Sequence, residues 1–463
     1  MFDSQVYKER RNALRLQLKG GLILLLGNNE ASSNYPANTY NFRQDSSFLY
    51  FFGINHPGFA GIIDVDGGEE ILFGNDFTMD DIIWMGPQPS VADMAHRVGI
   101  EKSASLAQIR QMIKNAQRQG RQIHFLPPYR HANKLWLEEL SGIRASQLIS
   151  NASIELIKAI VTLRSVKSAI EIAEIERACD IGYEMHTTAM RMCKPGVKEQ
   201  LIYGAIEGIA MSYGAGVSFP TILSMNGETL HNHNHGNILQ EGRLMLTDAG
   251  AETNMNYCSD FTRTVPVGGH FTNRQKDIYN IVVAAHDCAI DYAHPGNTWK
   301  EVHLSACRII ANGLKELGLM RGNVDEAVAA GAHALFMPHG LGHMMGLDVH
   351  DMEDLGQIYV GYDDEIRPSE QFGLASLRMG RRLQEGFVIT DEPGIYFIPA
   401  LIDQWRAEGL HKEFLCYDNI EKYKDFGGIR LEDDVLITAS GSRFLGKKRI
   451  PLYVEDVENM MNN

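Results

Sequence analysis

Two aspartates frame a predicted hairpin in the second half of the chain. Asp248 ends an apolar strand pattern that begins at residue 244, and Asp260 opens the next strand pattern. If the strands turn over residues 253–255, Asp248 faces Asp260, and directly opposed residues have Cβ atoms about 4.5 to 5.5 Å apart. Carboxylates at that distance repel each other unless a cation lies between them or one is protonated. A metal site and a pair of solvated hairpin carboxylates both fit this pattern.

A glycine-rich segment, residues 338–351, contains His339, His343 and His350. Glycines at three intervening positions allow close backbone approach and unusual dihedral angles, so the three imidazoles can converge. A functional cluster and ordinary core or surface histidines are both compatible with the segment.

Two glutamates, Glu392 and Glu432, lie beside apolar strand patterns at 387–389 and 435–437. An unpaired carboxylate is costly to bury, so these side chains need partners. The adjacent Asp433 and Asp434 fit a solvated pair. Four carboxylates and one imidazole form an oxygen-rich set that suits two manganese, cobalt or zinc ions about 3.5 to 4 Å apart.

Three further histidines alternate upstream, at His231, His233 and His235. In an extended strand their rings share one face, as in a metal-binding tract. Their spacing does not single out one of them.

The elements that must position these residues form two predicted domains, 1–155 and 156–463. The first is a small α/β domain, with helices at 12–19, 106–118 and 131–140, a strand at 21–27, a hairpin at 60–74 and an apolar run at 123–126. A long helix at 165–193 opens the second. Residues 353–377 and 398–424 are predicted to be long loops or insertions.

Composition narrows the class of protein. The 463 residues carry 58 acidic and 43 basic side chains, a formal charge of -15, with 44% hydrophobic and 22% charged residues. We therefore expect a soluble globular protein that does not bind nucleic acid. No apolar run approaches the roughly 18 to 20 residues that a membrane span needs, and no secretory signal precedes the first helix, so we expect a cytoplasmic protein without membrane partners. The six cysteines are isolated, which favours reduced buried thiols over disulfides or a zinc knuckle.

The order of motifs resembles the pita-bread metallopeptidases, the family of aminopeptidase P, prolidase and methionine aminopeptidase. An Asp, a second Asp within a hairpin, H-G-x-G-H at 339–343, E-P-G-I-Y at 392–396 and R-x-E-D-D at 430–434 follow one another. Residues 41–46 and 48–53 also resemble the amino-terminal domain of aminopeptidase P and prolidase. The resemblance implies an α/β (α+β) fold in which a small amino-terminal α/β domain precedes a pita-bread catalytic domain.

The resemblance also implies the ligands. Asp248 would hold one ion, Asp260 and Glu432 would bridge both, and His343 and Glu392 would hold the other. His231 falls at the family's upstream active-site histidine, and His339 and His350 match two histidines that flank the substrate. Arg430 would pair with an acidic ligand and orient it.

The activity implied is a dinuclear metal-dependent exopeptidase that hydrolyses Xaa-Pro bonds in small peptides with proline at the second position. Manganese is expected, with cobalt or zinc as alternatives, and the family implies a homodimer. Glu392 is the candidate proton carrier, and His231 and His350 are candidates for stabilising the oxyanion.

Prolidase is favoured over aminopeptidase P because of the long interval between Glu392 and Glu432 and the S-L-R run that contains Arg378. In prolidase-like proteins this arginine meets the substrate carboxylate, so Arg378 would select dipeptides; a surface arginine is the alternative. Trp84 would either reach a partner subunit's site or pack locally.

Three other classes share parts of this pattern. A metal-free creatinase-type hydrolase has no use for the five ligands, and neither has a non-catalytic peptide-binding module. Methionine aminopeptidase normally lacks the amino-terminal domain.

Overall fold

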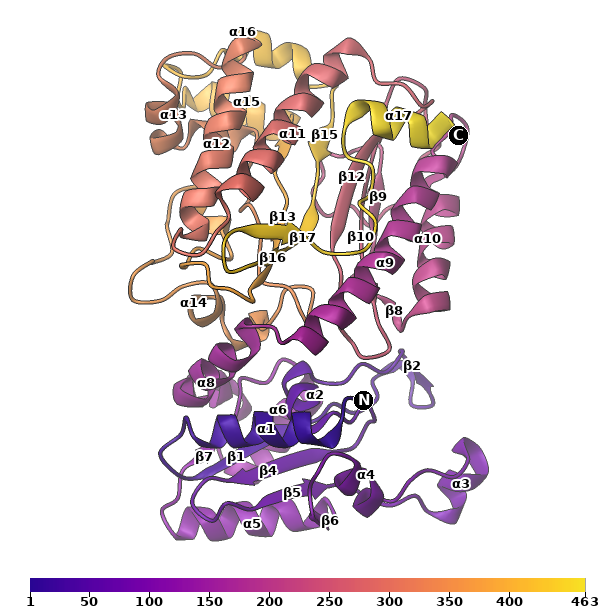
Figure 1. Ribbon diagram of the computed structural model, residues 1–463, viewed down its shortest axis with the longest axis vertical. Coiled ribbons are helices and arrows are strands. Elements are labelled where there is room, and N and C mark those ends of the chain that lie inside the picture. The colour runs from indigo at the N-terminus through magenta and orange to yellow at the C-terminus, as the bar shows by residue number, and fades with distance from the viewer. Residues whose placement is uncertain (463) are drawn as a thin grey trace. The chain divides into compact units, whose positions relative to one another are not determined.

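A computed structural model describes residues 1–462, which divide into two compact units (Figure 1). Unit 1 contains Met1–Arg164 and Met352–Tyr359, and unit 2 contains Ser165–Asp351 and the described residues from Val360 onward. Residue 155, the predicted boundary, lies in helix α8 (Ile154–Ser165). Both units mix helices with sheets, so the predicted α/β class is confirmed.

Unit 1 is built on a five-stranded mixed sheet in the order β6-β5-β4-β1-β7. Strand β1 pairs antiparallel with the central strand β4 and parallel with the edge strand β7. The strands are β1 (Leu22–Leu26), β4 (Ala60–Asp64), β5 (Glu70–Phe73), β6 (Lys102–Ala104) and β7 (Ile123–His124), with a separate ribbon of β2 (Ser32–Tyr35) and β3 (Asn38–Thr39).

The core of unit 1 follows from strand alternation. Leu22 and Leu24 of β1 share one face of the sheet, where they pack with Ile109 and Ile113 of α5. The first helix covers Ser4–Arg15 rather than the predicted 12–19, because the Asp3 side chain accepts a hydrogen bond from the backbone N–H of Gln5 (2.8 Å) and caps it. The helices are α1 (Ser4–Arg15), α2 (Ser46–Phe52), α3 (Met79–Met85), α4 (Val91–Arg97), α5 (Ala107–Arg118), α6 (His131–Ser141), α7 (Leu148–Asn151) and α8.

Unit 2 places two helix pairs against short strands (Figure 1). Helix α9 packs on β10, β11 and β12, and α11 packs on β13, β14, β15 and β17. Helices α11 and α12 each begin with a capping box, at Thr272 and Thr298 respectively. The helices are α9 (Ala169–Met192), α10 (Glu199–Tyr213), α11 (Asn273–Tyr292), α12 (Trp299–Glu316), α13 (Val324–Ala330), η2 (Ala332–Leu335) and α17 (Val454–Asn462).

The strands of unit 2 form small antiparallel sheets in the orders β12-β10-β9, β13-β16-β17, β14-β15 and β11-β8. Their bounds are β8 (Gly216–Val217), β9 (Ile222–Ser224), β10 (Leu244–Ala249), β11 (Ala251–Glu252), β12 (Phe261–Pro266), β13 (Val388–Asp391), β14 (Gly394–Tyr396), β15 (Gly428–Arg430), β16 (Asp433–Ile437) and β17 (Ser442–Phe444).

The segment 398–424, predicted to be a long loop or an insertion, is not a loop. This segment folds into α15 (Pro399–Glu408), α16 (Tyr417–Ile420) and the short turn η5 (Glu421–Tyr423). Pro399 at the first turn and the burial of Ile402 and Trp405, three positions apart, explain the helix α15. Residues 353–377 are mostly irregular, with the short turns η3 (Glu353–Leu355), α14 (Gln357–Val360) and η4 (Leu374–Ser376).

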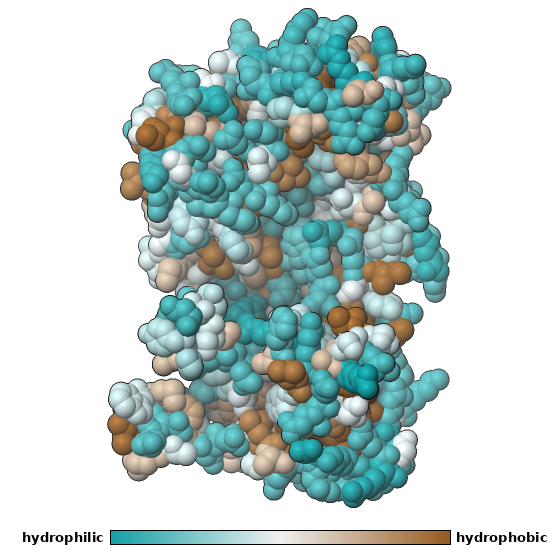
Figure 2. Space-filling model, turned by 180° about the vertical axis from the view of Figure 1, so that it is seen from behind, coloured by the Kyte–Doolittle hydropathy of each residue, from teal (hydrophilic) through white to brown (hydrophobic). Residues whose placement is uncertain are grey.

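Polar residues dominate the face of the molecule in Figure 2, where apolar residues form small separate patches. Within residues 1–462, no helix combines the length and the apolar content that crossing a membrane requires. All six cysteines are free, as predicted; four are buried, whereas Cys288 and Cys416 are half-buried.

Candidate active site

The acidic hairpin has a different register from the predicted one. Asp248 pairs with Thr262 rather than with Asp260, so the prediction is wrong by two residues. The turn is longer than assumed: it spans 253–257, closed by a hydrogen bond from Thr253 N to Tyr257 O (2.9 Å), with Asn256 in the left-handed region (φ 66°). Because side chains alternate with a period of two, the shift leaves Asp248 and Asp260 on one face, as diagonal neighbours.

The two glutamates meet across a second strand pair. Asp391 of β13 pairs with Asp433 of β16, and Gly394 of β14 pairs with Arg430 of β15. The same register places Glu392 opposite Glu432, at the junction of the two ladders.

Thr262 connects the acidic hairpin to this junction. The backbone N–H of Glu432 donates to Thr262 O (3.0 Å), and the Thr262 hydroxyl donates to Glu432 Oε2 (2.6 Å). The carboxylates of both hairpins therefore face one space.

The glycine-rich histidine segment lies against β13. His343 N donates to Thr390 Oγ1 (3.1 Å), and Thr390 N donates to His343 O (3.0 Å). A Cβ atom on Gly342 would lie 1.8 Å from the Thr390 carbonyl oxygen, so only glycine permits this approach. The close contact brings the His343 ring beside the acidic residues.

The five proposed metal ligands and most of the other candidate site residues border one cavity of about 420 Å³ in unit 2. Its lining includes His231, His233, Asp248, Asp260, His339, His343, His350, Arg378, Glu392, Arg430 and Glu432. The structure thus brings together residues that the sequence distributes over 202 positions, from 231 to 432. The roles assigned to them stay predictions.

The upstream histidines do not form the extended tract that their alternation predicted, because residues 231–235 adopt turn and irregular backbone. His231 and His233 line the cavity. His235 instead stacks on Tyr203, with ring centroids 4.2 Å apart, and a nitrogen of its ring lies 2.9 Å from Leu223 O.

The imidazoles lie within reach of the carboxylates. His343 Nε2 is 3.4 Å from Asp260 Oδ2 and 3.8 Å from Glu392 Oε1. The His350 ring stacks on that of His343, with centroids 3.8 Å apart. His339 Nδ1 is 3.8 Å from Glu392 Oε2.

Arg430 orders the wall of the cavity. Its Nη2 donates to Asp248 Oδ2, its Nη1 donates to the Tyr396 hydroxyl (3.0 Å), and its Nε donates to Thr262 Oγ1 (3.1 Å). Because Tyr396 accepts from Arg430, its proton is directed to His339 Nε2, 2.9 Å away. Burial, followed by the charge of Arg430, lowers the pKa of His339 to about 3, so this ring is neutral.

The acidic cluster carries more negative charge than the protein alone accommodates. Burial, and then the charges of Glu432 and Asp248, raise the pKa of Asp260 well above its usual range. Burial also raises the pKa of Glu392 to about 7, although Arg430 opposes the shift. Burial is the main cause of both shifts, and neighbouring carboxylates add to it.

The donor set fits a divalent metal centre. Asp248 Oδ1 and Asp260 Oδ1 are buried and have no hydrogen-bond partner within residues 1–462. Asp260, His343 and Glu432 each offer one ligand atom, and these atoms lie within 4.8 Å of one another. Cations between the carboxylates would satisfy the two bare oxygens and remove the repulsion.

Asp433 and Asp434 are buried, so the interpretation of a solvated pair is wrong. Asp433 pairs with Arg263 (2.7 Å), and Asp434 Oδ2 accepts from the backbone N–H of Asp260 (3.0 Å). The sequence pattern did not reveal these partners because they come from β12 and its preceding residue, about 170 positions earlier. Arg263, a basic residue within the apolar pattern of β12, is the one sequence signal that a buried acidic partner exists.

Comparisons with known proteins identify the family of the chain. The model of metallopeptidase family M24 matches residues 173–439, and that of the aminopeptidase P N-terminal domain matches residues 7–126. The chain is 32% identical to the Xaa-Pro dipeptidase of Homo sapiens over 458 residues, 96% of this chain and 89% of the relative. It is 31% identical to the Xaa-Pro aminopeptidase of Escherichia coli K12 over 469 residues, 99% and 97% of the two chains.

Solved structures of aminopeptidase P have the same fold as this chain. Zinc-substituted E. coli aminopeptidase P in complex with product matches with a TM-score of 0.80 and 28% identity, over 100% of this chain and 98% of that one. Aminopeptidase P II from Yersinia pestis matches with a TM-score of 0.79 and 29% identity, over 100% of each chain. The predicted pita-bread fold is therefore confirmed. The chain belongs to metallopeptidase family M24 and carries an amino-terminal domain of the aminopeptidase P type.

Proposed function

We propose that the chain is a dinuclear metal-dependent exopeptidase that hydrolyses Xaa-Pro bonds, with a preference for dipeptides. The observation that carries the proposal is the convergence of Asp248, Asp260, His343, Glu392 and Glu432 on one cavity. Two relatives, one named Xaa-Pro dipeptidase and the other Xaa-Pro aminopeptidase, support the substrate class.

The proposal assigns Asp248 to one ion, Asp260 and Glu432 to both, and His343 and Glu392 to the other. Manganese is the proposed metal, since oxygen-rich ligand sets suit it. Cobalt and zinc are the alternatives, because they also accept carboxylate and imidazole ligands. When bound, the two ions supply Lewis acidity and lower the pKa of water at the site.

The chain's own residues would bind the substrate and transfer the protons. Glu392 takes the proton of the attacking water and delivers it to the leaving proline nitrogen. His231 and His350, which line the cavity, donate hydrogen bonds to the oxygen that becomes negative. His339 keeps its Nε2 toward Tyr396 and its Nδ1 toward Gly340 O (2.8 Å), so it stays neutral beside the substrate.

Arg378 carries the dipeptide preference. Its side chain lines the cavity together with the five proposed ligands. A guanidinium there would form a charge-assisted pair with the free carboxylate of a proline at the second position. A longer peptide has an amide at that point and gains no such pair.

Aminopeptidase P activity is the alternative, because the relatives of the two kinds match almost equally well. The family also suggests a homodimer with domains 1–155 and 156–463, which we include in the proposal. A cytoplasmic location stays a prediction.

The test is hydrolysis of Ala-Pro beside Ala-Pro-Ala, by protein stripped of metal and then resupplied with manganese, with released alanine as the readout. Cleavage of Ala-Pro alone is expected and identifies the dipeptidase. Cleavage of the tripeptide would identify an aminopeptidase P. Inactivity on both substrates with every metal would contradict the proposal in favour of a peptide-binding module.

Asp260→Asn removes a bridging carboxylate with little change in volume, and it should abolish metal-dependent cleavage. Asp277→Asn is the matched control, since Asp277 is exposed on α11. Equal activity of the two variants would contradict the ligand assignment.

A further inference from the structure

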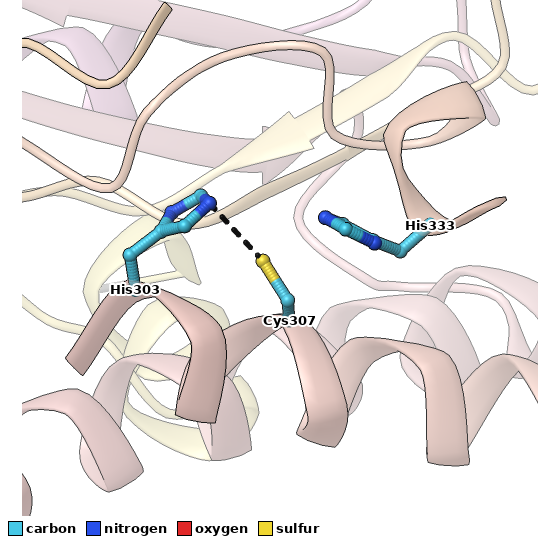
Figure 3. Close-up of side chains that lie close together, drawn as sticks. All are labelled: His303, Cys307 and His333. Atoms are coloured by element: carbon cyan, nitrogen blue, oxygen red, sulfur yellow. Dashed lines mark hydrogen bonds between the residues drawn. The ribbon is translucent and has the colours of Figure 1, made fainter. Parts of the chain in front are cut away.

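A second group of metal-ligand side chains lies in unit 2, away from the acidic cavity. His303 and Cys307 lie one turn apart on α12, and His333 lies in the short turn η2 (Figure 3). The spacing of four residues puts the first two side chains on one face of the helix. None of the three is among the residues that line the acidic cavity.

The three side chains converge on one point. His303 Nε2 is 3.5 Å from Cys307 Sγ, and one ligand atom from each of the three residues lies within 4.8 Å of the others. Figure 3 shows the His333 ring directed at the Cys307 sulfur from the opposite side to His303. A tetrahedral zinc ion with Zn–S of about 2.3 Å and Zn–N of about 2.0 to 2.1 Å would hold sulfur and nitrogen about 3.6 Å apart.

The protein alone leaves this group incompletely paired. All three residues are at most 2% exposed. Nδ1 of His303 and Nδ1 of His333 have no hydrogen-bond partner within residues 1–462. His303 faces Cys307 with its Nε2, so a metal would bind that nitrogen and leave the proton of the neutral ring on Nδ1.

The chemistry of the donors selects the ion. One sulfur and two imidazole nitrogens form a softer set than the carboxylates of the acidic cavity, and thiolates favour zinc over manganese. Three protein ligands leave the fourth position of a tetrahedron for a small solvent-derived ligand.

We propose that His303, Cys307 and His333 form a second metal site, which binds one Zn²⁺ ion as a Cys-His₂ centre. Binding converts the Cys307 thiol to a thiolate; the sulfur–metal bond forms as the S–H bond breaks, and the proton passes to solvent. The two imidazoles bind as neutral rings, the form that coordinates a metal. The proposal is independent of the Xaa-Pro activity.

The position of the site gives the ion a structural role. His333 accepts, through its backbone oxygen, hydrogen bonds from Phe336 N (3.0 Å) and Met337 N (3.1 Å), and the chain then runs on to His339 in the acidic cavity. An ion at the site would tie α12 to the start of this segment. We therefore expect zinc to stabilise the segment that carries the cavity histidines.

Cobalt is the probe, because a cysteine thiolate gives Co²⁺ an intense charge-transfer absorption that oxygen and nitrogen ligands do not. No cysteine among residues 1–462 lines the acidic cavity, so this absorption reports the second site alone. The full chain is produced in cells supplied with cobalt, because a buried site fills as the protein folds. We expect the thiolate band and one cobalt per chain beyond those held by the acidic cavity.

Cys307→Ser should abolish the band and lower the cobalt content by one per chain. Cys193→Ser, at an equally buried cysteine that follows α9, is the matched control and should keep both. Absence of the band from the wild-type protein, or its persistence in Cys307→Ser, would overturn the proposal.

X-ray absorption of the zinc-loaded wild-type protein makes the test independent of variant folding. A sulfur scatterer at about 2.3 Å is expected, at about one sulfur per three zinc ions when zinc also fills the two positions of the acidic cavity. A zinc environment of only nitrogen and oxygen would overturn the proposal in the same way.

Discussion

Arg430 and Asp248 form a buried ion pair between residues that are 182 positions apart, and the arginine reaches Tyr396 and Thr262 from the same guanidinium. The pair turns one oxygen of Asp248 toward Arg430 and leaves the other without a hydrogen-bond partner in the described chain, 1–462. In the proposed metal centre, the arginine would therefore fix the direction in which Asp248 binds an ion.

Arg430→Lys should weaken metal binding or catalysis about 10- to 100-fold, because lysine keeps the charge but cannot make the three-way contact. Metal titration and kcat/KM on Ala-Pro measure the effect. Arg443→Lys, at an exposed pair with Glu176, is the control. An Arg430→Lys protein that matches the control would contradict the orienting role.

Arg378→Ala should raise KM for Ala-Pro about 10- to 100-fold, the loss expected for one charge-assisted hydrogen bond. Cleavage of Ala-Pro-Ala should change little, because that substrate has no carboxylate at this position. The exposed Arg367, which pairs with Asp364, provides the control Arg367→Ala. An equal loss on both peptides would show that Arg378 does not select dipeptides.

Gly342→Ala should lower the free energy of unfolding by about 1 to 3 kcal/mol and impair catalysis, because the added methyl meets a backbone carbonyl and displaces His343. Urea denaturation gives the stability. Gly204→Ala in α10, where an added Cβ meets nothing within 4 Å, should instead stabilise by about 0.5 to 1 kcal/mol. Similar free energies of unfolding for the two variants would contradict the close approach of Gly342 to the Thr390 carbonyl oxygen.

His186 predicts a loss of stability in acid. Burial lowers its pKa to about 4 in the folded protein, where a ring nitrogen lies 2.9 Å from Ala249 O. In the unfolded chain His186 has a pKa near 6.5 and therefore binds a proton more readily than in the folded protein. The contribution of neutral His186 to the free energy of unfolding is thus complete above about pH 6.5 and is lost as the pH falls toward 4.

The full shift corresponds to about 3 kcal/mol. Urea denaturation between pH 7 and pH 4 should show a shallower decline for His186→Gln than for the wild-type protein. Parallel pH profiles would show that His186 does not titrate as proposed.

The order of the motifs was sufficient to predict the fold and to identify residues that line one cavity, because local sequence patterns mark strand ends and glycine-rich turns. The hairpin register was not predictable, since it depends on a turn in which Asn256 takes a left-handed conformation that other residues rarely adopt. The buried Asp433 and the helix at 399–408 depend on partners that are distant in sequence. The role of those partners appears only once the chain has folded.

The cluster of His303, Cys307 and His333 was missed for a different reason. Cysteine-based zinc sites are marked in a sequence by paired cysteines, whereas the spacing here is a histidine four positions before a cysteine on one helix. The third member comes from a turn 26 positions further on, which no periodicity connects to the helix.

The long separation between Asp248 and Arg430 has a consequence during synthesis. At about 5 to 20 residues per second, a ribosome adds Arg430 roughly 9 to 36 s after Asp248. Until then the aspartate lacks the cation that orients it, and Glu432 does not yet exist. The proposed set of ligands is therefore complete only after residue 432 has been added, so the acidic cavity would take up ions late in synthesis, from whatever metals the surrounding solution then offers.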